Sequence, residues 1–407
     1  MSAPQVQSPR SVLISGASIA GPALAYWLDR YGFDVTVVER AEAVRSGGYP
    51  IDLRGVAMEV IERMGLLPQV KAAHIHSRTI SFVDASGGLI ATIPMYDMIA
   101  NEADQDVELP RGTLTGLVYG LTKDSKVRYR FNESIDTLED DGDGVDVRFK
   151  SGERQRYEIV IGADGLHSNT RRLLFGPEEQ FVHYLGQTFN LFTVPNYLGL
   201  SHGAMFYAEP GRAAGVFVVQ DSDKMFVMLN FATEKPPFVG HADREEQIER
   251  TAAVFAAGGW EVPRLLDELR HADDLYFDTV SQIRLPQWSK GRVVLVGDSA
   301  FAPSFQSGQG TSIALVSAYV LAGELAAHQS PTEAFAAYER VVRPFVEANQ
   351  GLAIKAKGAS PLLPRTQEEL DMRNRMLASF KPGQRDERQL HAKAVHNSLT
   401  LPDYGLS

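Results

Sequence analysis

A glycine-rich loop at residues 16–21 (GASIAG) constrains the fold of this chain more than any other feature. It follows Ser11–Ser15, a short β-branched run that is typical of a strand buried on both faces of a parallel sheet. Apolar residues at helical spacing come next over Pro22–Arg30, and a second apolar run, Phe33–Val38, ends at Glu39. This strand–helix–strand order with a terminal acidic residue, expected to bind ribose hydroxyls, is what a dinucleotide-binding fingerprint requires.

The positions of this loop differ in what we expect them to do. Gly16 permits a tight turn, Gly21 lets the helix approach the strand, and the small Ser18 replaces the middle glycine of the pattern while keeping the backbone open to phosphate. Ile19 and Ala20 stand at the predicted helix start, whose N–H groups and dipole favour a pyrophosphate. The alternative is an accidental strand–turn–helix.

A second glycine-rich loop lies near the other end of the chain. Arg292–Val296 is predicted to be a buried strand that ends at Gly297 and Asp298, and residues 308–310 (GQG) open an apolar helix at Thr311. We expect Asp298 to accept hydrogen bonds from sugar hydroxyls. The alternative is a glycine-rich helix start without a ligand.

A third motif follows the predicted strand Tyr157–Ile161. Residues 162–165 (GADG) place the Asp164 carboxylate and the bare backbone of Gly165 at the carboxyl edge of the sheet, where ligands bind in open α/β folds. The alternative is an ordinary Asp-Gly turn with Ser168 capping the next helix.

The order of these loops indicates that distant parts of the chain enclose one long cofactor with phosphates in its middle, which favours FAD. The helix start at Thr311 suits this assignment, because a reduced flavin carries negative charge around N1 and the C2 carbonyl and a helix N-terminus stabilises such charge. The second loop would then stabilise the negative charge of the reduced flavin.

Composition excludes several other classes of protein. The 407 residues, 44% of them hydrophobic, are enough for a large globular core, and the net charge of −11 without a basic block argues against nucleic acid. The absence of cysteine excludes disulfides, thiolate metal sites and cysteine nucleophiles. The start of the chain shows no signal-peptide pattern, and the longest apolar segment, Ile313–Ala327, is predicted to be a buried helix rather than a membrane span, so a cytoplasmic protein is expected.

The three motifs in this order resemble the class A flavoprotein monooxygenases, which share the para-hydroxybenzoate hydroxylase fold. The likeness spans residues from about 11 to 345, and residues 47–53 (GGYPIDL) with the Arg111 segment resemble the branch that contains tetracycline-inactivating and polyketide-tailoring hydroxylases. The resemblance implies an α/β fold with a Rossmann-like FAD-binding domain, a mixed β-sheet substrate domain and C-terminal helices.

The resemblance also implies roles for individual residues. Pyrophosphate would lie at Gly16–Gly21, the adenosine at Glu39 and Arg40, and the ribityl chain or phosphates at Arg111 and Asp298. Gly47 and Gly48 would form a flexible stretch that lets the flavin swing between two positions. The remaining implied cofactor residues are Asp164 and Gly165, which serve both FAD and NAD(P)H, and Gly297, Gly308, Gln309, Gly310 and Thr311, which surround the edge of the isoalloxazine.

The chain departs from the family in the second loop. Many members carry His after Gly-Asp-Ala-Ala and Pro four residues later, where this chain has Phe301 and Phe305, with Pro303 between them. Flavin halogenases are disfavoured, because the three tryptophans are isolated and no Trp-x-Trp pattern exists.

In this family NAD(P)H, a transient cosubstrate, reduces the flavin, O2 adds at C4a, and the resulting hydroperoxide hydroxylates an electron-rich substrate. The resemblance therefore implies FAD-dependent hydroxylation of a hydrophobic aromatic or polyketide-like molecule, in a biosynthetic, degradative or resistance role. Flavin-centred chemistry needs no separate catalytic acid or base, and no triad or paired carboxylate is found in the sequence. Two alternatives remain: a flavin-dependent dehydrogenase or reductase, and a non-catalytic flavin or small-molecule binding protein.

Short aromatic-rich strands between residues 180 and 275 predict a sheet with one face over a substrate cavity. The candidates for the pocket wall are Phe189, Phe206, Phe217, Met228, Asn230, Phe301 and Phe305, although aromatic alternation also fits an ordinary core. Helices are expected over Arg244–Ala257, Phe345–Ala356 and Thr366–Ser379, with an extended or disordered tail from Pro382.

These patterns divide the chain into three parts. We expect a discontinuous FAD-binding domain over residues 1–73, 98–178 and 276–340, a substrate-binding β-sheet domain over 74–97 and 179–275, and a C-terminal helical segment over 341–407.

Overall fold

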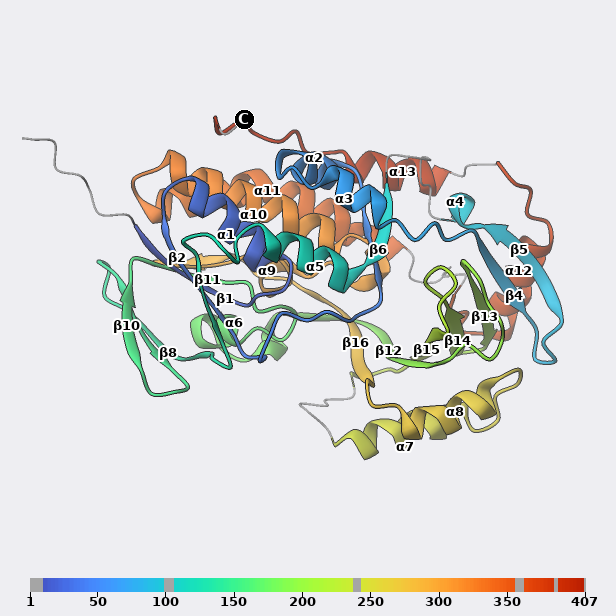
Figure 1. Cartoon of the computed structure of the whole chain (residues 1–407). Coiled ribbons are helices and arrows are strands. Elements are labelled where there is room, and N and C mark those ends of the chain that lie inside the picture. Colours follow the sequence, from blue (N-terminus) through green and yellow to red (C-terminus); the bar gives the residue numbers. More distant parts are fainter. Residues whose placement is uncertain (1–9, 99–105, 237–242, 356–361, 384–386, 406–407) are drawn as a thin grey trace, which may run out of the picture.

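The computed structural model describes residues 10–98, 106–236, 243–355, 362–383 and 387–405. Two large sheets organise the chain (Figure 1), a six-stranded sheet near the N-terminal motif and a seven-stranded sheet beside it. A two-stranded ribbon of β3 (Pro50–Leu53) and β6 (Val107–Pro110) belongs to neither sheet.

The six-stranded sheet has the order β17-β18-β11-β1-β2-β7, and only β17 runs antiparallel to its neighbour. Its strands are β1 (Ser11–Ser15), β2 (Asp34–Glu39), β7 (Arg128–Phe131), β11 (Ile159–Gly162), β17 (Ser289–Lys290) and β18 (Val293–Leu295). Ser15 pairs with Gly162, and Gly162 pairs with Leu295. The three strands that carry the sequence motifs are therefore adjacent and end at one edge.

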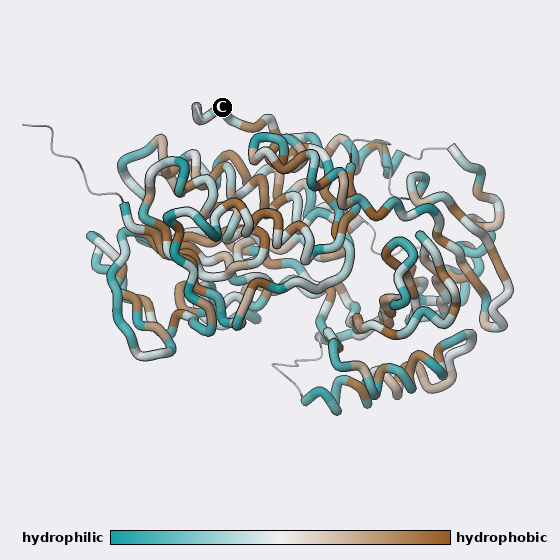
Figure 2. Tube along the Cα trace, in the orientation of Figure 1, coloured by the Kyte–Doolittle hydropathy of each residue, from teal (hydrophilic) through white to brown (hydrophobic). Residues whose placement is uncertain are grey.

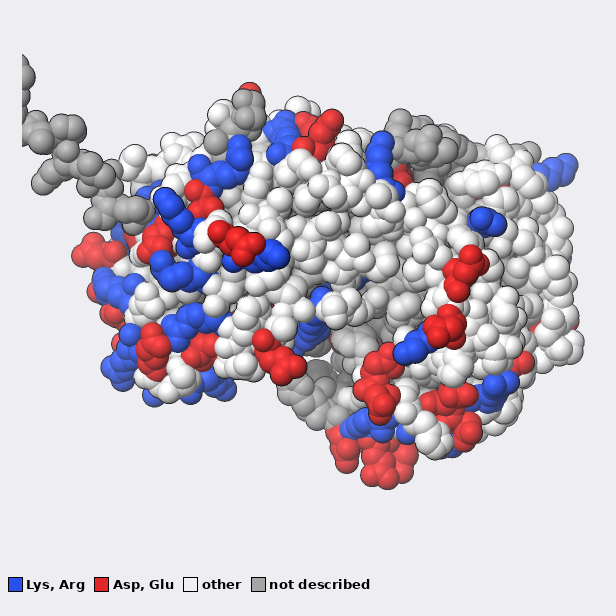
Figure 3. Space-filling model, viewed as in Figure 1, with Lys and Arg blue, Asp and Glu red and all other residues white. Residues whose placement is uncertain are grey.

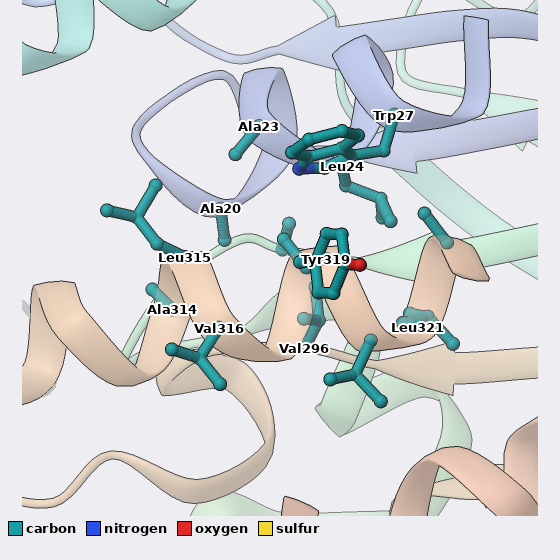
Figure 4. Packing of buried hydrophobic residues seen from close by; sticks show 14 of the residues in the cluster. Ala20, Ala23, Leu24, Trp27, Val296, Ala314, Leu315, Val316, Tyr319 and Leu321 are labelled. Atoms are coloured by element: carbon teal, nitrogen blue, oxygen red, sulfur yellow. The ribbon is translucent and has the colours of Figure 1, made fainter. Parts of the chain in front are cut away.

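Helices cover one face of this sheet, and α10 lies at their centre. They are α1 (Ala20–Arg30), α2 (Val56–Arg63), α3 (Leu67–Ala72), α5 (Arg111–Gly120), α10 (Gly310–Ala327) and α11 (Pro331–Lys355). Figure 4 shows Trp27 of α1 over Tyr319 of α10, with ring centroids 5.0 Å apart. Figure 2 shows hydrophobic residues concentrated in these helices and in the central strands. By length and composition α10 is apolar enough to cross a membrane, yet 78% of it is buried inside the protein, as in a core helix.

The opposite face packs on a three-stranded antiparallel sheet. Leu13, Val38 and Val160 of the parallel strands contact Val145 and Val147 from it in one apolar cluster. The elements on this side are β8 (Ile135–Asp140), β9 (Val145–Phe149), β10 (Arg154–Tyr157), α6 (Asn169–Phe175) and the short η1 (Glu178–Gln180).

The seven-stranded sheet has the order β16-β12-β15-β14-β13-β4-β5. Its strands are β4 (Thr79–Val83), β5 (Leu89–Pro94), β12 (Val182–Pro195), β13 (Gly203–Glu209), β14 (Arg212–Phe217), β15 (Lys224–Ala232) and β16 (Tyr276–Ile283). One face packs on α7 (Arg244–Phe255) and α8 (Val262–His271) through Phe192, Val227 and Leu265. The other face packs on α12 (Gln367–Ala378) and on the C-terminal end of α11.

The remaining short elements are α4 (Met95–Met98), α9 (Asp298–Phe301), η2 (Phe305–Ser307) and α13 (Glu387–His396). In Figure 3 charged side chains are dense over β8 and β10 and again over α7 and α8, while the surface over α5 and β6 is mostly uncharged.

The structure differs from the sequence expectations in three places. Strand β16 belongs to the seven-stranded sheet, because it pairs with β12, although residues 276–340 were assigned to the FAD-binding domain. The expected boundary at residue 340 falls inside α11, which continues through Pro344. The tail from Pro382 contains α13, whose Val395 and His396 are buried, so the prediction of an extended or disordered tail was wrong there.

Candidate functional site

The first glycine loop makes a turn that only glycine fits. Gly16 has φ +110°, and a Cβ there would lie less than 3.0 Å from the backbone of Ala163. A Cβ on Gly21 would approach the carbonyl oxygen of Gly16 equally closely. Helix α1 starts at Ala20, and Ile19, its N-cap residue, makes no side-chain cap hydrogen bond. The N–H groups of this helix start are open to a phosphate.

Glu39 stands beside this loop at the end of β2. Its Oε2 accepts a hydrogen bond from the Ala17 N–H at 2.8 Å, and its Oε1 accepts one from the Ala41 N–H at 3.0 Å. Arg40 follows at the surface. The carboxylate is therefore fixed next to the turn, where the fingerprint places a sugar.

Arg111 links the first loop to the segment around Gly48. It is the first residue of α5, and its Nη2 donates a hydrogen bond to the Ser18 hydroxyl at 3.1 Å. A Cβ on Gly48 would lie 3.4 Å from the Arg111 Cβ. Ser18, Gly48 and Arg111 thus come together from three elements, whereas Gly47 contacts nothing within 4 Å of its Cβ position.

The second loop presents an unpaired carboxylate to a helix start. Gly297 has φ +65°, Asp298 follows, and α10 begins at Gly310 with no side-chain cap from Gln309. Within the described residues no hydrogen bond or ion pair engages the half-buried Asp298 carboxylate, although its Oδ1 lies 3.7 Å from the Cβ position of Gly310. Burial raises the pKa of Asp298, and the positive charges of Arg111 and Arg171 oppose that rise.

Two buried polar groups at this loop also lack partners. Gln309 Oε1 and Arg54 Nε are buried without a hydrogen bond in the described part of the chain. Arg54 forms an ion pair with Asp52 at 2.9 Å, and both side chains lie under 4 Å from the Cβ position of Gly308. Unsatisfied buried donors and acceptors are costly, and a bound polar group relieves that cost. The open helix starts, the free Asp298 and these groups fit a cofactor such as FAD.

In the third motif the Asp164 carboxylate is already occupied. It accepts hydrogen bonds from the Thr170 N–H and hydroxyl, each at 2.8 Å, and from the Ser168 hydroxyl. Gly165 follows with φ +82°. These contacts hold the start of α6 against the sheet edge, so the local capping that the sequence offered as an alternative is present.

The candidate wall residues on the seven-stranded sheet share one face. Phe189 is paired with Asn230, and Asn230 with Ala213, so their side chains point the same way. Met228 lies on that face two residues along, and Phe217 stacks on Phe226 with a centroid distance of 5.2 Å. The face looks toward the second loop, because Phe189 meets Phe305 at 4.7 Å.

The two other candidates are Phe206 and Phe301. Phe206 is 8% exposed and lies on the same face as this group, in one apolar cluster with Phe82, Phe217 and Leu377 of α12. Phe301 is 1% exposed, and its ring meets Trp288 at 4.4 Å. It lines a separate cavity of about 430 Å³ together with Arg343 and Gln350. The side chain of Phe301 thus serves packing.

Sequence reasoning missed several polar residues next to the site. They are Tyr49, Asp52, Arg54, His167, Tyr276 and Asp278, and their interactions with one another or with site residues join segments far apart in the chain. Asp52 and Arg54 lie four and six residues after Gly48, and this nearness to the glycine pair is the one signal that could have revealed them.

Comparison with known proteins agrees with this geometry. The family described as FAD binding domain matches residues 10–351. The uncharacterised protein Rv1260 of Mycobacterium tuberculosis strain H37Rv is 43% identical over 365 residues, which cover 89% of this chain and 97% of that protein. A flavin-dependent monooxygenase from an unknown prokaryotic organism is 36% identical over 397 residues, 97% of this chain and 99% of the relative. The crystal structure of tetracycline destructase Tet(55) superposes with a TM-score of 0.83 at 35% identity and covers 98% and 100% of the two chains.

The chain therefore belongs to the FAD binding domain family. Within it, the curated relatives and the solved neighbours identify a class A flavoprotein monooxygenase, an FAD-dependent oxidoreductase. The predicted α/β fold with a Rossmann-like FAD-binding domain and a mixed-sheet region is confirmed.

Proposed function

We propose that this protein uses NAD(P)H and O2 to hydroxylate a hydrophobic aromatic or polyketide-like small molecule. The contact between Phe189 and Phe305, with ring centroids 4.7 Å apart, carries the proposal. It joins the apolar face of the seven-stranded sheet to the loop that opens α10, so a flat apolar substrate on that face would lie beside the cofactor loop.

Bound FAD would supply the redox chemistry, accepting a hydride from NAD(P)H and passing the electrons to O2, so that one oxygen atom enters the substrate and the other leaves as water. The chain's own residues would bind and orient the cofactor. Gly16–Gly21 and the start of α1 take the pyrophosphate, Glu39 the ribose, and Arg111 with Asp298 the groups between pyrophosphate and ring. The start of α10 at Gly310 favours negative charge on the ring system.

The apolar wall orients the substrate and keeps water from the reacting atoms. Phe217 and Met228 pack against the same apolar cluster as Tyr49, which comes from the glycine-pair segment of the cofactor side. Burial raises the pKa of Tyr49, so its hydroxyl stays neutral and can donate a hydrogen bond into the site. The wall suits a large neutral ring system better than a small acid, and the tetracycline destructase neighbour makes fused-ring polyketides the first compounds to try.

The test begins with the visible absorbance of the purified protein, which shows bound flavin. NADPH and NADH oxidation is then followed together with O2 uptake while tetracyclines, other polycyclic phenols and simple phenols are added one at a time. A product heavier by one oxygen atom confirms the proposal. Substrate oxidation that proceeds without O2 would assign a dehydrogenase instead, and bound flavin without any turnover would assign a binding protein.

A further inference from the structure

A chain of hydrogen bonds crosses from the surface to the edge of the candidate pocket. His167, in the loop after the third motif, lies between two carboxylates, with Nδ1 2.7 Å from Glu178 Oε1 and Nε2 3.1 Å from Asp278 Oδ2. The same Asp278 oxygen accepts a hydrogen bond from the Tyr276 hydroxyl at 2.6 Å. One carboxylate oxygen therefore joins the imidazole to the phenol.

Both ends of this chain of hydrogen bonds are exposed and its middle is buried, since Tyr276 is 43% exposed. The His167 side chain is 53% exposed, whereas the Asp278 side chain between the two ends is 6% exposed. The Tyr276 ring meets Phe189 at 5.8 Å, and Phe189 meets Phe305. Tyr276 also interacts electrostatically with Tyr49 and Arg111 on the cofactor side. The Tyr276 ring therefore borders the pocket wall, and its hydroxyl lies within the electrostatic influence of Tyr49 and Arg111.

The stoichiometry of the proposed reaction requires a proton at this place. NAD(P)H, one proton, O2 and a substrate R–H become NAD(P)⁺, R–OH and water. Without substrate, NAD(P)H, one proton and O2 become NAD(P)⁺ and H2O2. Each turnover thus consumes one proton from solvent in either case. Cofactor and substrate bound over Tyr276 and Phe305 would keep water from the reacting atoms, so the proton would need a route.

We propose that His167, Asp278 and Tyr276 form the path that carries this proton from solvent to the pocket, an inference that rests on the proposed oxygen-dependent function. The Tyr276 hydroxyl, which donates to Asp278 Oδ2 at rest, first turns its proton toward the pocket. His167 Nε2 then passes its proton to Asp278 Oδ2 as Tyr276 takes a proton from that oxygen and releases its own hydroxyl proton toward the reduced oxygen atom. His167 is then reprotonated from solvent. No bond other than those to the moving protons breaks, and the charge of the path is unchanged at the end.

The groups around the path set its protonation state at rest. The hydrogen bonds that His167 donates to Asp278 and to Glu178 raise the pKa of His167 to about 10, against the opposing effect of burial, so the imidazole carries its proton at neutral pH. Burial raises the pKa of Tyr276, and the Asp278 charge raises it further, while Arg111 opposes the rise. A neutral phenol at the pocket and a protonated imidazole at the surface are the states that a proton donor path needs at rest.

Glu178 has a second partner that keeps it in place. Arg171, fully buried, donates to the Glu178 carboxylate and to the carbonyl oxygen of Leu166 at 2.7 Å. Asp164 and Asp298 are the other charges that face Arg171. Glu178 is therefore a positioning residue that orients the imidazole, while Tyr276 is the group that faces the reacting atoms.

The experiment uses the holoenzyme and O2 alone, so it needs no knowledge of the substrate. The bound FAD is reduced without air and mixed with oxygenated buffer, and the return of flavin absorbance and the uptake of protons by an indicator dye are followed together. We expect Tyr276→Phe and Asp278→Asn to slow proton-coupled reoxidation by about a hundredfold, the low end of general acid–base contributions. The solvent deuterium isotope effect of the wild-type reaction should change in both variants.

His167→Ala distinguishes transfer from simple support of the fold. Because the imidazole is half exposed, added imidazole can enter its place, and reoxidation in His167→Ala should recover in proportion to the imidazole concentration. The control is His328→Ala, which removes a remote histidine beside a carboxylate, Glu324, at 3.4 Å and should behave as wild type with or without imidazole.

The outcomes separate this inference from the proposed function. A wild-type holoenzyme that O2 does not reoxidise would contradict the proposed monooxygenase activity. If Tyr276→Phe keeps its FAD and is reoxidised at the wild-type rate with the wild-type isotope effect, the proton path is overturned and the proposed function is untouched. If Tyr276→Phe loses FAD, the decision rests on Asp278→Asn and on the imidazole titration of His167→Ala. A reoxidation rate of His167→Ala that does not change with imidazole concentration would reject the path.

Discussion

The Arg111 guanidinium donates a hydrogen bond to the Ser18 hydroxyl at 3.1 Å, across 93 residues of sequence. This contact fixes a positive charge beside the first glycine loop, at the position where the motif lacks its middle glycine. Serine lacks the conformational freedom of the glycine in the pattern, but its side chain accepts a hydrogen bond that holds the arginine in place. The pair connects the loop that is expected to bind pyrophosphate with α5 and, through Gly48, with the segment that precedes β3.

Removing the arginine should weaken FAD binding far more than removing the serine. A hydrogen bond to a charged group contributes about 1.5–3 kcal/mol, which corresponds to a rise of roughly tenfold or more in the dissociation constant. We expect that rise in Arg111→Gln and a smaller one in Ser18→Ala, measured by titrating apoprotein with FAD and following flavin fluorescence. Arg128→Gln, on the far strand β7, is the control. Equal affinities in Arg111→Gln and the control would show that the guanidinium does not contact the cofactor.

A substitution at Gly21 tests how closely α1 packs against β1. Because a Cβ there would meet the Gly16 carbonyl, Gly21→Ala must displace the helix start, and we expect loss of bound FAD together with a lower melting temperature. Gly116→Ala in α5 is the matched control, since its Cβ would meet nothing within 4 Å, and helix propensity predicts a gain of up to about 1 kcal/mol there. Retention of FAD and stability in Gly21→Ala would contradict the close approach.

The pH dependence of stability should reveal the two hydrogen bonds of His167. Its pKa is raised in the folded protein from 6.5 to about 10, so the protonated form is stabilised by folding. The contribution is therefore complete below about pH 6.5, provided that the carboxylates stay ionised, and is lost as the pH rises through about 10. The melting temperature of His167→Gln should lie below that of wild type near pH 6 and converge with it above pH 10. A difference that grows with pH would contradict the assignment.

Much of this arrangement could be predicted from local sequence, and the failures have physical causes. The strands before Gly16, Gly162 and Gly297 were predictable, since each is a short β-branched run followed by glycine. Strand β16 was misplaced because pairing with β12 is a long-range choice that no local pattern encodes. Helix α13 was missed because its sequence is polar, and it is held by tertiary contacts such as that of His396 with Gly55.

The polar residues of the site escaped prediction for a related reason. Asp278 lies in a strand whose alternation suggests ordinary sheet, and its significance comes only from His167, which stands 111 residues earlier. Asp164 shows the opposite case, because the motif predicts its place at the sheet edge, while the hydrogen bonds through which its carboxylate holds α6 are visible only in the structure. Motif position predicts the place of a residue more securely than the direction of its side chain.

Phe301 explains how the chain tolerates its departure from the family pattern. Its ring packs against Trp288 in the core, so Phe301→His would place a polar imidazole in a buried apolar position. We expect a loss of about 1–3 kcal/mol in the free energy of unfolding, measured by urea denaturation, without a gain in flavin affinity. Unchanged stability together with tighter FAD binding would show that the imidazole reaches the cofactor.

Phe305 and Phe206 should separate binding from packing in the candidate pocket. Phe305 is 38% exposed beside Phe189, so Phe305→Ala should cost little stability and raise the KM for an aromatic substrate, because it removes part of the wall. Phe206 is 8% exposed under Leu377, so Phe206→Ala should lower the free energy of unfolding by about 3–5 kcal/mol, the usual cost of truncating a buried ring. Steady-state kinetics at a temperature well below both melting points, combined with urea denaturation, measure the two effects independently. The reverse result, with Phe206→Ala stable and defective in KM, would move the pocket toward α12 and away from the loop that opens α10.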